Sequence, residues 1–489
     1  MACVHTAVQQ YLGHPMNIVA VDFASRQGAP VVQPTHDECQ ALLQLGDGVA
    51  TRMPQAENLL RSWREAVGAL ENADLEPAAF EAELDRLALA LRRICLGLAH
   101  AASDRALRSP RDRDHTTAPD GEEISFGYER SIAPEKLEAR LQSYAPAPAG
   151  WHADHLLFSS GQAAMSCLLL ALSPRGANPA NPPRIRHLGG YFETEELLAM
   201  MSSHGMIREL PQNGDDHADV LILEPVYFDR DAQVHRLDMT AALKSHCATA
   251  EGCPSLVIVD STLVGPCFDL DPLLPQQLTC SEAGHILVRM SSGLKLDQAG
   301  LELANVGLVS LYRREDQVFA VDPAEKLRKA RTLTGAGLGF DALGALEAPW
   351  FLDREHARGY AEAVFENNAE LAQRLAEVDG LFSQVSHPSL GADSGAAAPF
   401  VLIQLEDDSP ENYRKLEQLI AREAKARDRR FDKGGSFGFR GHRYEAILPQ
   451  AGEITPFLRV ALGARKGWSR DGIIDLLCEI AQAKSLDAF

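Results

Sequence analysis

The sequence predicts a doubly wound α/β fold with a mostly parallel central sheet, a smaller α+β domain after it and a helical extension before it. Three observations lead to this prediction. Short β-rich runs alternate with helical segments between about 150 and 312. These runs are continuously apolar, as in strands that are buried on both faces of a sheet. Most of these strands also end in polar or small residues, as strands do at the ligand-binding edge of such sheets.

The predicted strands belong to five apolar runs. They are HLLFSS at 155–160, ADVLILEPV at 218–226, SLVIVDST at 255–262, HILVRMSS at 285–292 and LANVGLVSLY at 303–312. Four of them carry candidate ligand-binding residues at their carboxyl ends, namely Ser159-Ser160-Gly161, Glu224-Pro225, Asp260-Ser261-Thr262 and Ser291-Ser292-Gly293. Because ligands gather at the carboxyl ends of parallel strands, we expect one pocket to collect these groups.

The region before the sheet is predicted to be helical. Apolar residues recur there at steps of three and four, which lines one face of a helix that begins after Pro77. They are Phe80, Leu84, Leu87, Leu91, Ile94 and Leu98. The stretch at 103–123 is charged and broken by two prolines, which is typical of a connector. We expect the apolar face to pack on a core or on another subunit.

The character of the chain changes again after about 345. A long helix at 354–377, a strand at 399–406, a further helix and a last strand at 456–463 predict a smaller α+β domain. We therefore expect three parts, which are an extension and linker at 1–123, a large domain at 124–345 and a C-terminal domain at 346–489.

Composition excludes several classes of protein. The 489 residues are 45% hydrophobic with a formal net charge of -21, which predicts a globular chain that repels nucleic acid. No segment reaches the roughly 18 apolar residues of a membrane helix, and the first residues lack a signal-peptide pattern, so we expect a cytoplasmic protein. The nine cysteines are scattered without a Cys-x-x-Cys pair. We expect reduced, mostly buried thiols, no disulfide framework and no metal site.

The residues that carry chemistry lie at the strand ends. Lys295 follows an apolar strand in Ser-Ser-Gly-Leu-Lys, where a buried lysine is costly unless it is neutral, paired or covalently engaged. The alternative is a strand-end lysine that reaches solvent. Asp260 closes another strand and could hold a ring nitrogen protonated, or it could cap the next turn. Gly161 and Gln162 precede the apolar run MSCLLLAL, so free N–H groups at a helix start could cradle a phosphate.

The order of these features resembles the Cys/Met-metabolism family of pyridoxal 5'-phosphate (PLP) enzymes, the cystathionine γ-synthase and γ-lyase group. The resemblance runs from about 125 to the C-terminus, and it implies the aspartate-aminotransferase-like fold, fold type I. It implies that Lys295 carries PLP as a Schiff base and that Asp260 faces the ring nitrogen. Ser160-Gly161-Gln162-Ala163-Ala164 is similar to the family's Ser-Gly-Met-Ala-Ala, so Gly161 and Gln162 are the expected phosphate donors together with Ser292.

The resemblance implies roles for further residues. Tyr191, in Tyr-Phe-Glu-Thr, matches the tyrosine that stacks on the ring and helps in proton transfer. Tyr128 and Arg130 match a Tyr-x-Arg that reaches the phosphate from a neighbouring subunit, which implies a homodimer or homotetramer. Ser436 and Arg459 resemble the segments that hold the substrate α-carboxylate, and the planar fork of an arginine suits that task.

The sequence departs from the family pattern at several places. Ser291 and Leu294 stand where the family has His and Thr before the lysine, and Glu-x-Pro-x-Asn-Pro is replaced by the segment at 224–229, which loses the asparagine. The helical extension before 124 has no counterpart in ordinary members. These changes remove polar groups and add aromatic ones, so we expect a divergent, specialised member.

The expected reaction is elimination or replacement at Cγ of an amino acid that bears a γ leaving group. A specialised role follows from the departures, for example alkyne formation from a chlorinated allylglycine. The alternatives are a β-lyase, an aminotransferase and a PLP-binding protein without catalytic activity. The sequence leaves open the substrate side chain, the leaving group, the choice between elimination and replacement, the role of the extension and the number of subunits beyond two.

Overall fold

The computed structural model describes residues 33–489 except 104–106, 112–115, 174–180, 215, 248–252, 274–284, 392–396, 449–454, 484 and 487–489. Over these residues the chain forms two compact units. One unit comprises 1–132, 295–304 and 339–489, and the other comprises 133–294 and 305–338. The three-part division inferred from the sequence remains a prediction.

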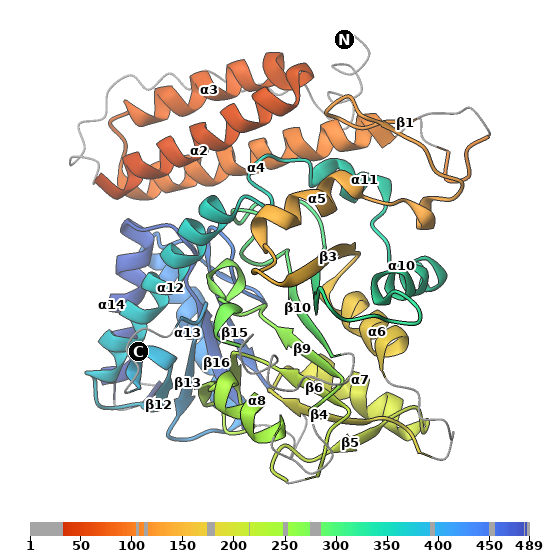
Figure 1. The fold of residues 1–489 in the computed structure, drawn as a ribbon. Coiled ribbons are helices and arrows are strands. Elements are labelled where there is room, and N and C mark those ends of the chain that lie inside the picture. Colours follow the sequence, from red (N-terminus) through yellow and green to blue (C-terminus); the bar gives the residue numbers. More distant parts are fainter. Residues whose placement is uncertain are drawn as a thin grey trace. The chain divides into compact units, whose positions relative to one another are not determined.

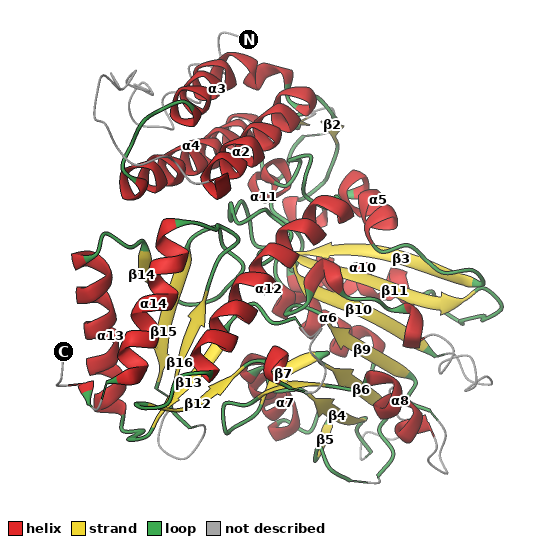
Figure 2. Cartoon of the chain, turned by 90° about the vertical axis from the view of Figure 1, so that its left-hand side faces the viewer, coloured by secondary structure: helices red, strands yellow, loops and turns green. Residues whose placement is uncertain are grey.

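The unit at 133–294 and 305–338 is built on a seven-stranded sheet, shown with yellow strands in Figure 2. Its strands, in sheet order, are β3 (Trp151–Phe158), β11 (Gly307–Arg314), β10 (Ile286–Ser292), β9 (Leu256–Asp260), β6 (Val220–Leu223), β4 (Arg184–Leu188) and β5 (Arg208–Leu210). The pairs from β10 to β5 are parallel, while β11 runs antiparallel to both of its neighbours. The predicted α/β class with a mostly parallel sheet is confirmed.

Helices connect these strands. They are α5 (Glu135–Tyr144), α6 (Gly161–Leu172), α7 (Phe192–Ser203), α8 (Met239–Cys247) and α10 (Pro323–Thr334), with a small hairpin of β7 (Val226–Phe228) and β8 (Val234–Arg236) and the 3-10 turns η3 (Gly265–Cys267) and η4 (Asp271–Leu273). One core packs α6, α7 and α10 on alternate residues of the strands, such as Val220 and Ile222 of β6 or Leu256 and Ile258 of β9. Because side chains alternate across a strand, these residues share one face of the sheet.

The extension forms the helices that its apolar periodicity predicts. It contains α2 (Gln33–Arg52), η1 (Pro54–Ala56), α3 (Glu57–Glu71) and α4 (Pro77–Ser103), which lie beside one another in Figure 1. The apolar stripe from Phe80 to Leu98 is buried in one core with Trp63. Ala345 and Trp350, which follow the seven-stranded sheet in the sequence, belong to the same core. After α4 come β1 (Thr116–Thr117), β2 (Glu123–Ile124) and η2 (Glu129–Ser131), and α11 (Phe340–Ala345) packs on α4.

The C-terminal part of the same unit is a five-stranded sheet covered by helices. Its strand order is β12 (Phe382–Ser386), β13 (Val401–Leu405), β16 (Phe457–Ala461), β15 (His442–Ile447) and β14 (Phe431–Lys433), and only β14 and β15 pair in parallel. The helices are α12 (Arg354–Ala376), α13 (Pro410–Ala426) and α14 (Trp468–Gln482), with η5 (Pro388–Leu390). The predicted long helix and the two predicted strands are present.

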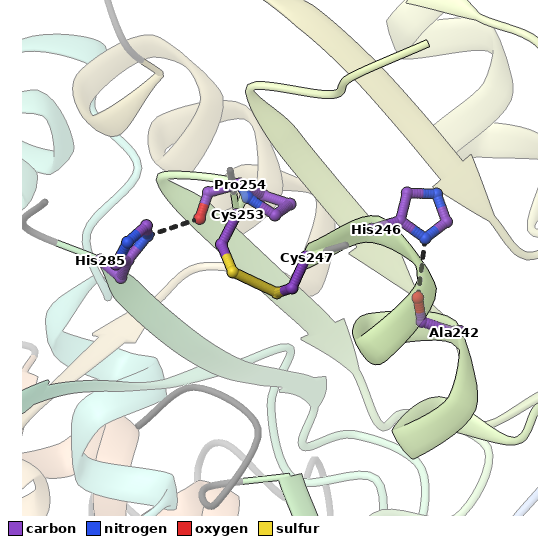
Figure 3. Close-up of a disulfide and its surroundings, with 6 residues drawn as sticks. All are labelled: Ala242, His246, Cys247, Cys253, Pro254 and His285. Atoms are coloured by element: carbon purple, nitrogen blue, oxygen red, sulfur yellow. Dashed lines mark hydrogen bonds between the residues drawn. A yellow bond between two sulfur atoms is a disulfide. The ribbon is translucent and has the colours of Figure 1, made fainter. Parts of the chain in front are cut away.

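The cysteines require a correction. Cys247 and Cys253 form a disulfide that joins the end of α8 to the segment before β9 (Figure 3). The prediction of reduced thiols was wrong here, because two cysteines only six residues apart can pair without a Cys-x-x-Cys spacing. Of the five cysteines described as free, four are buried as expected and Cys267 is half-buried. Among the described residues, no helix combines the length and apolarity that a membrane span requires.

Candidate functional site

Asp260 and Ser292 are joined through one threonine at the carboxyl ends of neighbouring strands. In the parallel pair of β9 and β10, Asp260 lies opposite Met290, two residues before Ser292. Thr262 donates to Asp260 Oδ1 from its backbone N–H (2.9 Å) and its hydroxyl (2.6 Å), and the same hydroxyl accepts from the Ser292 N–H (3.0 Å). Both bonds to the carboxylate end on Oδ1, so Oδ2 is left to meet a different donor.

The charge on Asp260 is unfavourable in its present surroundings. Burial raises the pKa of the Asp260 carboxyl to about 6, and the nearby Glu224 carboxylate acts in the same direction. The Thr262 hydrogen bonds and the His187 imidazole oppose the rise without cancelling it. A cationic N–H donor beside Oδ2 would compensate the buried charge.

The predicted phosphate loop lies at the start of α6 beside Ser292. Ser160 caps the helix by accepting the Ala163 N–H at 3.0 Å, so the N–H groups of Gly161 and Gln162 belong to the first turn, which a helix cannot pair internally. A Cβ placed on Gly161 would lie 3.4 Å from Ser292 Cβ. The two N–H groups and the Ser292 hydroxyl therefore come from adjacent backbone, as an anion site at a helix N-terminus requires.

The backbone of Tyr191 is held by the buried pair of His187 and Glu224. Glu224 accepts the Tyr191 N–H on Oε1 and the Gly190 N–H on Oε2, both at 3.2 Å, and its Oε1 lies 2.7 Å from His187 Nε2. Hydrogen bonding and charge from Glu224 raise the pKa of His187 despite its burial, which favours the protonated imidazole. Gly190 is required at this turn, because a Cβ there would meet the Phe228 carbonyl oxygen.

The tyrosine side chain is itself half-buried. Burial, a hydrogen bond with Glu193 and the carboxylates of Glu193, Asp260 and Glu224 all raise its pKa, so Tyr191 is a neutral phenol. Its ring meets the exposed Phe192 ring edge-on, with centroids 5.5 Å apart. The tyrosine precedes α7 directly, and Gln162 of α6 donates to Thr194 of α7 at 3.3 Å, which ties the tyrosine loop to the phosphate loop.

In the other unit, Lys295 is held by the segment that contains Ser436. Lys295 Nζ donates to Ser436 Oγ and lies 5.5 Å from the centre of the Phe437 ring. Ser436 has a φ of 69°, in the left-handed region that non-glycine residues avoid. Gly438 packs so closely that a Cβ would lie 2.5 Å from the Lys295 carbonyl oxygen. The strained serine thus coincides with the contact to the lysine, as backbone strain at functional positions often does.

Arg459 lies at the other end of an aromatic pair. Its guanidinium lies 6.0 Å from the centre of the Phe400 ring, and the Phe400 and Phe437 rings are 5.6 Å apart. On β16 Arg459 is directly opposite Glu445 of β15, and its Nη2 donates to Glu445 Oε2 at 2.6 Å. The arginine is therefore partly buried and oriented by a carboxylate.

Tyr128 and Arg130 flank an ordered residue of the same loop. Both are exposed, and the Arg130 guanidinium lies 5.5 Å from the centre of the Tyr128 ring. Glu129 between them turns inward, where its carboxylate accepts the Phe340 N–H at 3.2 Å and pairs with Arg108. The loop is thus fixed while its two flanking side chains stay available to another molecule.

Sequence reasoning named Thr262 only as part of a polar strand end, and it missed His187 and Glu445, which also organise these groups. Thr262 carries a recognisable local signal, because an aspartate that accepts the N–H two residues later forms an Asx turn. The pairing of His187 with Glu224 depends on the register of β4 and β6 and has no local signal. Glu445 is cross-strand to Arg459 and depends likewise on sheet register.

Comparisons with known proteins give the fold. No protein-family model matches the sequence. No curated protein matches it either. Solved structures do match, including cystathionine γ-synthase from Xanthomonas oryzae pv. oryzae, which is 16% identical with a TM-score of 0.54 over 80% of this chain and 99% of that one.

Two further solved structures agree. Methionine γ-lyase from Micromonospora echinospora is 18% identical with a TM-score of 0.50, over 77% of this chain and 92% of that one. A putative O-acetylhomoserine (thiol)-lyase from Campylobacter jejuni contains a pyridoxyl-lysine monophosphate and is 15% identical with a TM-score of 0.51, over 74% and 88% of the two chains. The chain has the fold of these enzymes, and the predicted fold class is confirmed.

Proposed function

We propose that this chain is a PLP-dependent enzyme that catalyses elimination or replacement at Cγ of an amino acid. The observation that carries the proposal is a hydrogen-bonded group of Asp260, Thr262 and Ser292 at the adjacent carboxyl ends of β9 and β10. Ser292 of this group precedes Lys295 by three residues. Three residues span at most about 11 Å, so the Cα of Lys295 lies within that distance of the Cα of Ser292.

The residues present fit the phosphate of PLP. Gly161, Gln162 and Ser292 offer backbone N–H groups at a helix start and a hydroxyl beside them, which are the donors that a phosphate prefers. Tyr128 and Arg130 are exposed on a fixed loop, so we propose that they complete the phosphate site of a second copy in a homodimer or homotetramer.

The residues also fit the ring of PLP. Asp260 is a half-buried carboxylate whose pKa is raised to about 6 and whose Oδ2 takes no hydrogen bond from Thr262. A pyridinium N–H at that oxygen would compensate the buried charge. Bound there, PLP would supply a protonated ring that withdraws electrons from the substrate Cα.

The remaining roles fall to side chains of this protein. We propose that Arg459 binds the substrate α-carboxylate, because its guanidinium is partly buried and already oriented by Glu445. Lys295 Nζ takes the proton from Cα, and Ser436 keeps this amine in place. Tyr191 is a neutral phenol that would lie against the ring of bound PLP and could donate a proton to a departing group.

Loss of a further proton from Cβ then lets a leaving group depart from Cγ. The solved structures named as γ-synthase and γ-lyase favour this branch over direct loss from Cβ. A specialised substrate, such as a chlorinated allylglycine that yields an alkyne, is the finer proposal. Its support is the departure at 224–229, where Phe228 stands in place of the family's asparagine. β-Elimination and transamination are the competing outcomes.

The test is cofactor loading followed by borohydride reduction. We expect the protein to become yellow with PLP and, after reduction, to carry the cofactor on the peptide that contains Lys295. Lys295→Ala removes both signals, while Lys326→Ala, which changes an exposed lysine on α10, leaves them unchanged. A protein that takes up no PLP, or that is reduced at another lysine, would refute the proposal.

The reaction class is tested with amino acids that bear leaving groups at Cγ or at Cβ. Release of the γ group with ammonia and a keto acid, or its exchange for a thiol, supports the γ branch. Reaction of β-substituted substrates alone refutes it, and accumulation of pyridoxamine phosphate with a keto acid would identify an aminotransferase. Mass analysis of the carbon product separates an alkyne from these outcomes.

A further inference from the structure

The segment that holds Lys295 is itself held by the N-terminal extension. Arg440, at the end of that segment, donates from Nε (3.0 Å) and Nη2 to the Glu38 carboxylate of α2. Its Nη1 donates at 3.1 Å to the carbonyl of Ala299, four residues after the lysine. The buried Arg440 guanidinium therefore joins the extension both to the segment that contains Ser436 and to the chain that follows Lys295.

Burial makes this connection rigid. The Glu38 and Arg440 side chains are 11% and 9% exposed, and Arg465 lies 3.9 Å from the same carboxylate. A buried guanidinium that loses its carboxylate is left uncompensated, so the pair is kept together by the cost of separating it.

The backbone between Ser436 and Arg440 has little room to move. Tyr360 donates from its hydroxyl to the Gly438 carbonyl at 3.2 Å. A Cβ on Gly300 would meet Arg440 N at 2.6 Å, and one on Gly463 would meet the Arg440 carbonyl oxygen at 2.3 Å. The segment is packed on two sides, and Ser436 at its start has a left-handed backbone that such packing must maintain.

We infer that Glu38 is a positioning residue for Lys295: through Arg440 it fixes the 436–440 segment, which presents Ser436 to the Lys295 amine. This inference rests on the proposed role of Lys295. The extension thereby gains a function within the active site. Among the described hydrogen-bond partners of Arg440, Glu38 alone belongs to the extension.

The test measures the reactivity of Lys295 in protein without cofactor. Each lysine is acetylated under trace conditions and its rate is read by peptide mass spectrometry, with the exposed Lys326 as the internal reference. In Glu38→Gln we expect the Lys295 rate to rise at least about threefold, because the amine is no longer held against Ser436. Hydrogen exchange in the 436–440 peptide should accelerate in the same variant.

Asp37→Asn is the matched control. Asp37 is the neighbouring carboxylate on α2 and lines the same hollow of about 610 Å³ as Glu38, but it is exposed. Its removal changes the same charge at the same place and should leave the Lys295 rate within about 1.5-fold of wild type. An equal rise in both variants would reduce the effect to general electrostatics and overturn the inference.

A double-mutant cycle separates positioning from loss of structure. In a Ser436→Ala background, Glu38→Gln should have no further effect on Lys295, because the contact through which it acts is already absent. Additive effects would overturn the inference. So would an unchanged Lys295 rate in a folded Glu38→Gln variant.

Faster hydrogen exchange throughout α3 and α4 in Glu38→Gln would show that this substitution loosens the whole extension. In that case Arg440→Lys is measured in place of Glu38→Gln. That variant keeps a cation for Glu38 but cannot also donate to Ala299, so the same rise is expected, and its absence refutes the inference. Since no cofactor is present, these results do not depend on whether PLP binds. Uptake of PLP at Lys295 with no effect of Glu38 would reject the positioning role alone.

Discussion

Thr262 Oγ1 donates a 2.6 Å hydrogen bond to Asp260 Oδ1 while it accepts the Ser292 N–H at 3.0 Å. One hydroxyl thus fixes the carboxylate and the end of the neighbouring strand. Because the hydroxyl has a single proton, its donation to Asp260 leaves its lone pairs for Ser292, and the direction of both bonds is set. The proposed ring and phosphate contacts are therefore prepared by the same side chain.

Asp260→Asn should make the protein without cofactor more stable at neutral pH. The folded pKa of Asp260, about 6, exceeds its ordinary value of 3.8, so folding favours the protonated acid. The stability from this group is complete below pH 3.8 and is lost as pH rises to about 6. We expect the amide of the Asp260→Asn variant to recover on the order of 2–3 kcal/mol above this range and nothing below it.

Urea unfolding at pH 4 and at pH 7.5, with PLP removed, measures this difference. The same substitution should lower kcat by about a hundredfold or more in the loaded enzyme, since an amide cannot hold the ring nitrogen protonated. A variant that is less stable at pH 7.5 and fully active would contradict both the burial argument and the proposed role of Asp260.

His187→Gln should destabilise the protein most at mildly acid pH. The pKa of His187 is raised by Glu224, so its contribution is complete below its ordinary value of 6.5 and is lost as pH rises through the higher folded value. Loss of the charged partner of a buried carboxylate costs roughly 3 kcal/mol. The unfolding free energies of variant and wild type should therefore converge as pH rises.

The control for this prediction is His152→Gln. His152 is 48% exposed and pairs with Asp154 at 3.3 Å, a surface contact that contributes little. Its substitution should leave the unfolding free energy within about 0.5 kcal/mol at every pH. A His187→Gln curve parallel to wild type would show that the imidazole is neutral in the folded state.

The sequence was sufficient for the features that local pattern determines. Continuous apolar runs located β9 and β10, and Asp260 and Ser292 stand at the ends of these strands as predicted. The stripe that begins at Phe80 located α4. These signals are local because a buried strand or helix face must be apolar along its own length.

Features that depend on distant pairing could not be predicted in this way. His187 meets Glu224 only because β4 and β6 pair in one register, and Glu38 meets Arg440 across 402 residues. A glutamate on an amphipathic helix is ordinarily solvated, so nothing in its surroundings along the chain distinguishes Glu38. The sequence showed where the chain departs from the family pattern, but it did not show which residues contact those positions in the fold.

Arg459→Lys should weaken substrate binding more than it slows the chemical step. A lysine keeps the charge but loses the planar fork that binds a carboxylate through two hydrogen bonds. We expect KM for the amino acid to rise by about tenfold or more with a smaller change in kcat. The control is Arg443→Lys, since Arg443 bonds to Glu302 and stacks on Phe439. Equal effects of the two substitutions on KM would argue against a specific role for Arg459.

Mixed oligomers test whether Tyr128 and Arg130 serve a neighbouring subunit. Both side chains are exposed beside a loop that Glu129 fixes, so they can reach another copy without rearrangement of their backbone. Arg130→Ala and Lys295→Ala should each be nearly inactive alone. When the two variants are refolded together, a heterodimer regains one intact site, made from Lys295 of one subunit and Arg130 of the other. Random pairing then restores about a quarter of the wild-type activity. If the arginine served its own subunit instead, every mixed dimer would contain one damaged site of each kind and the mixture would stay inactive.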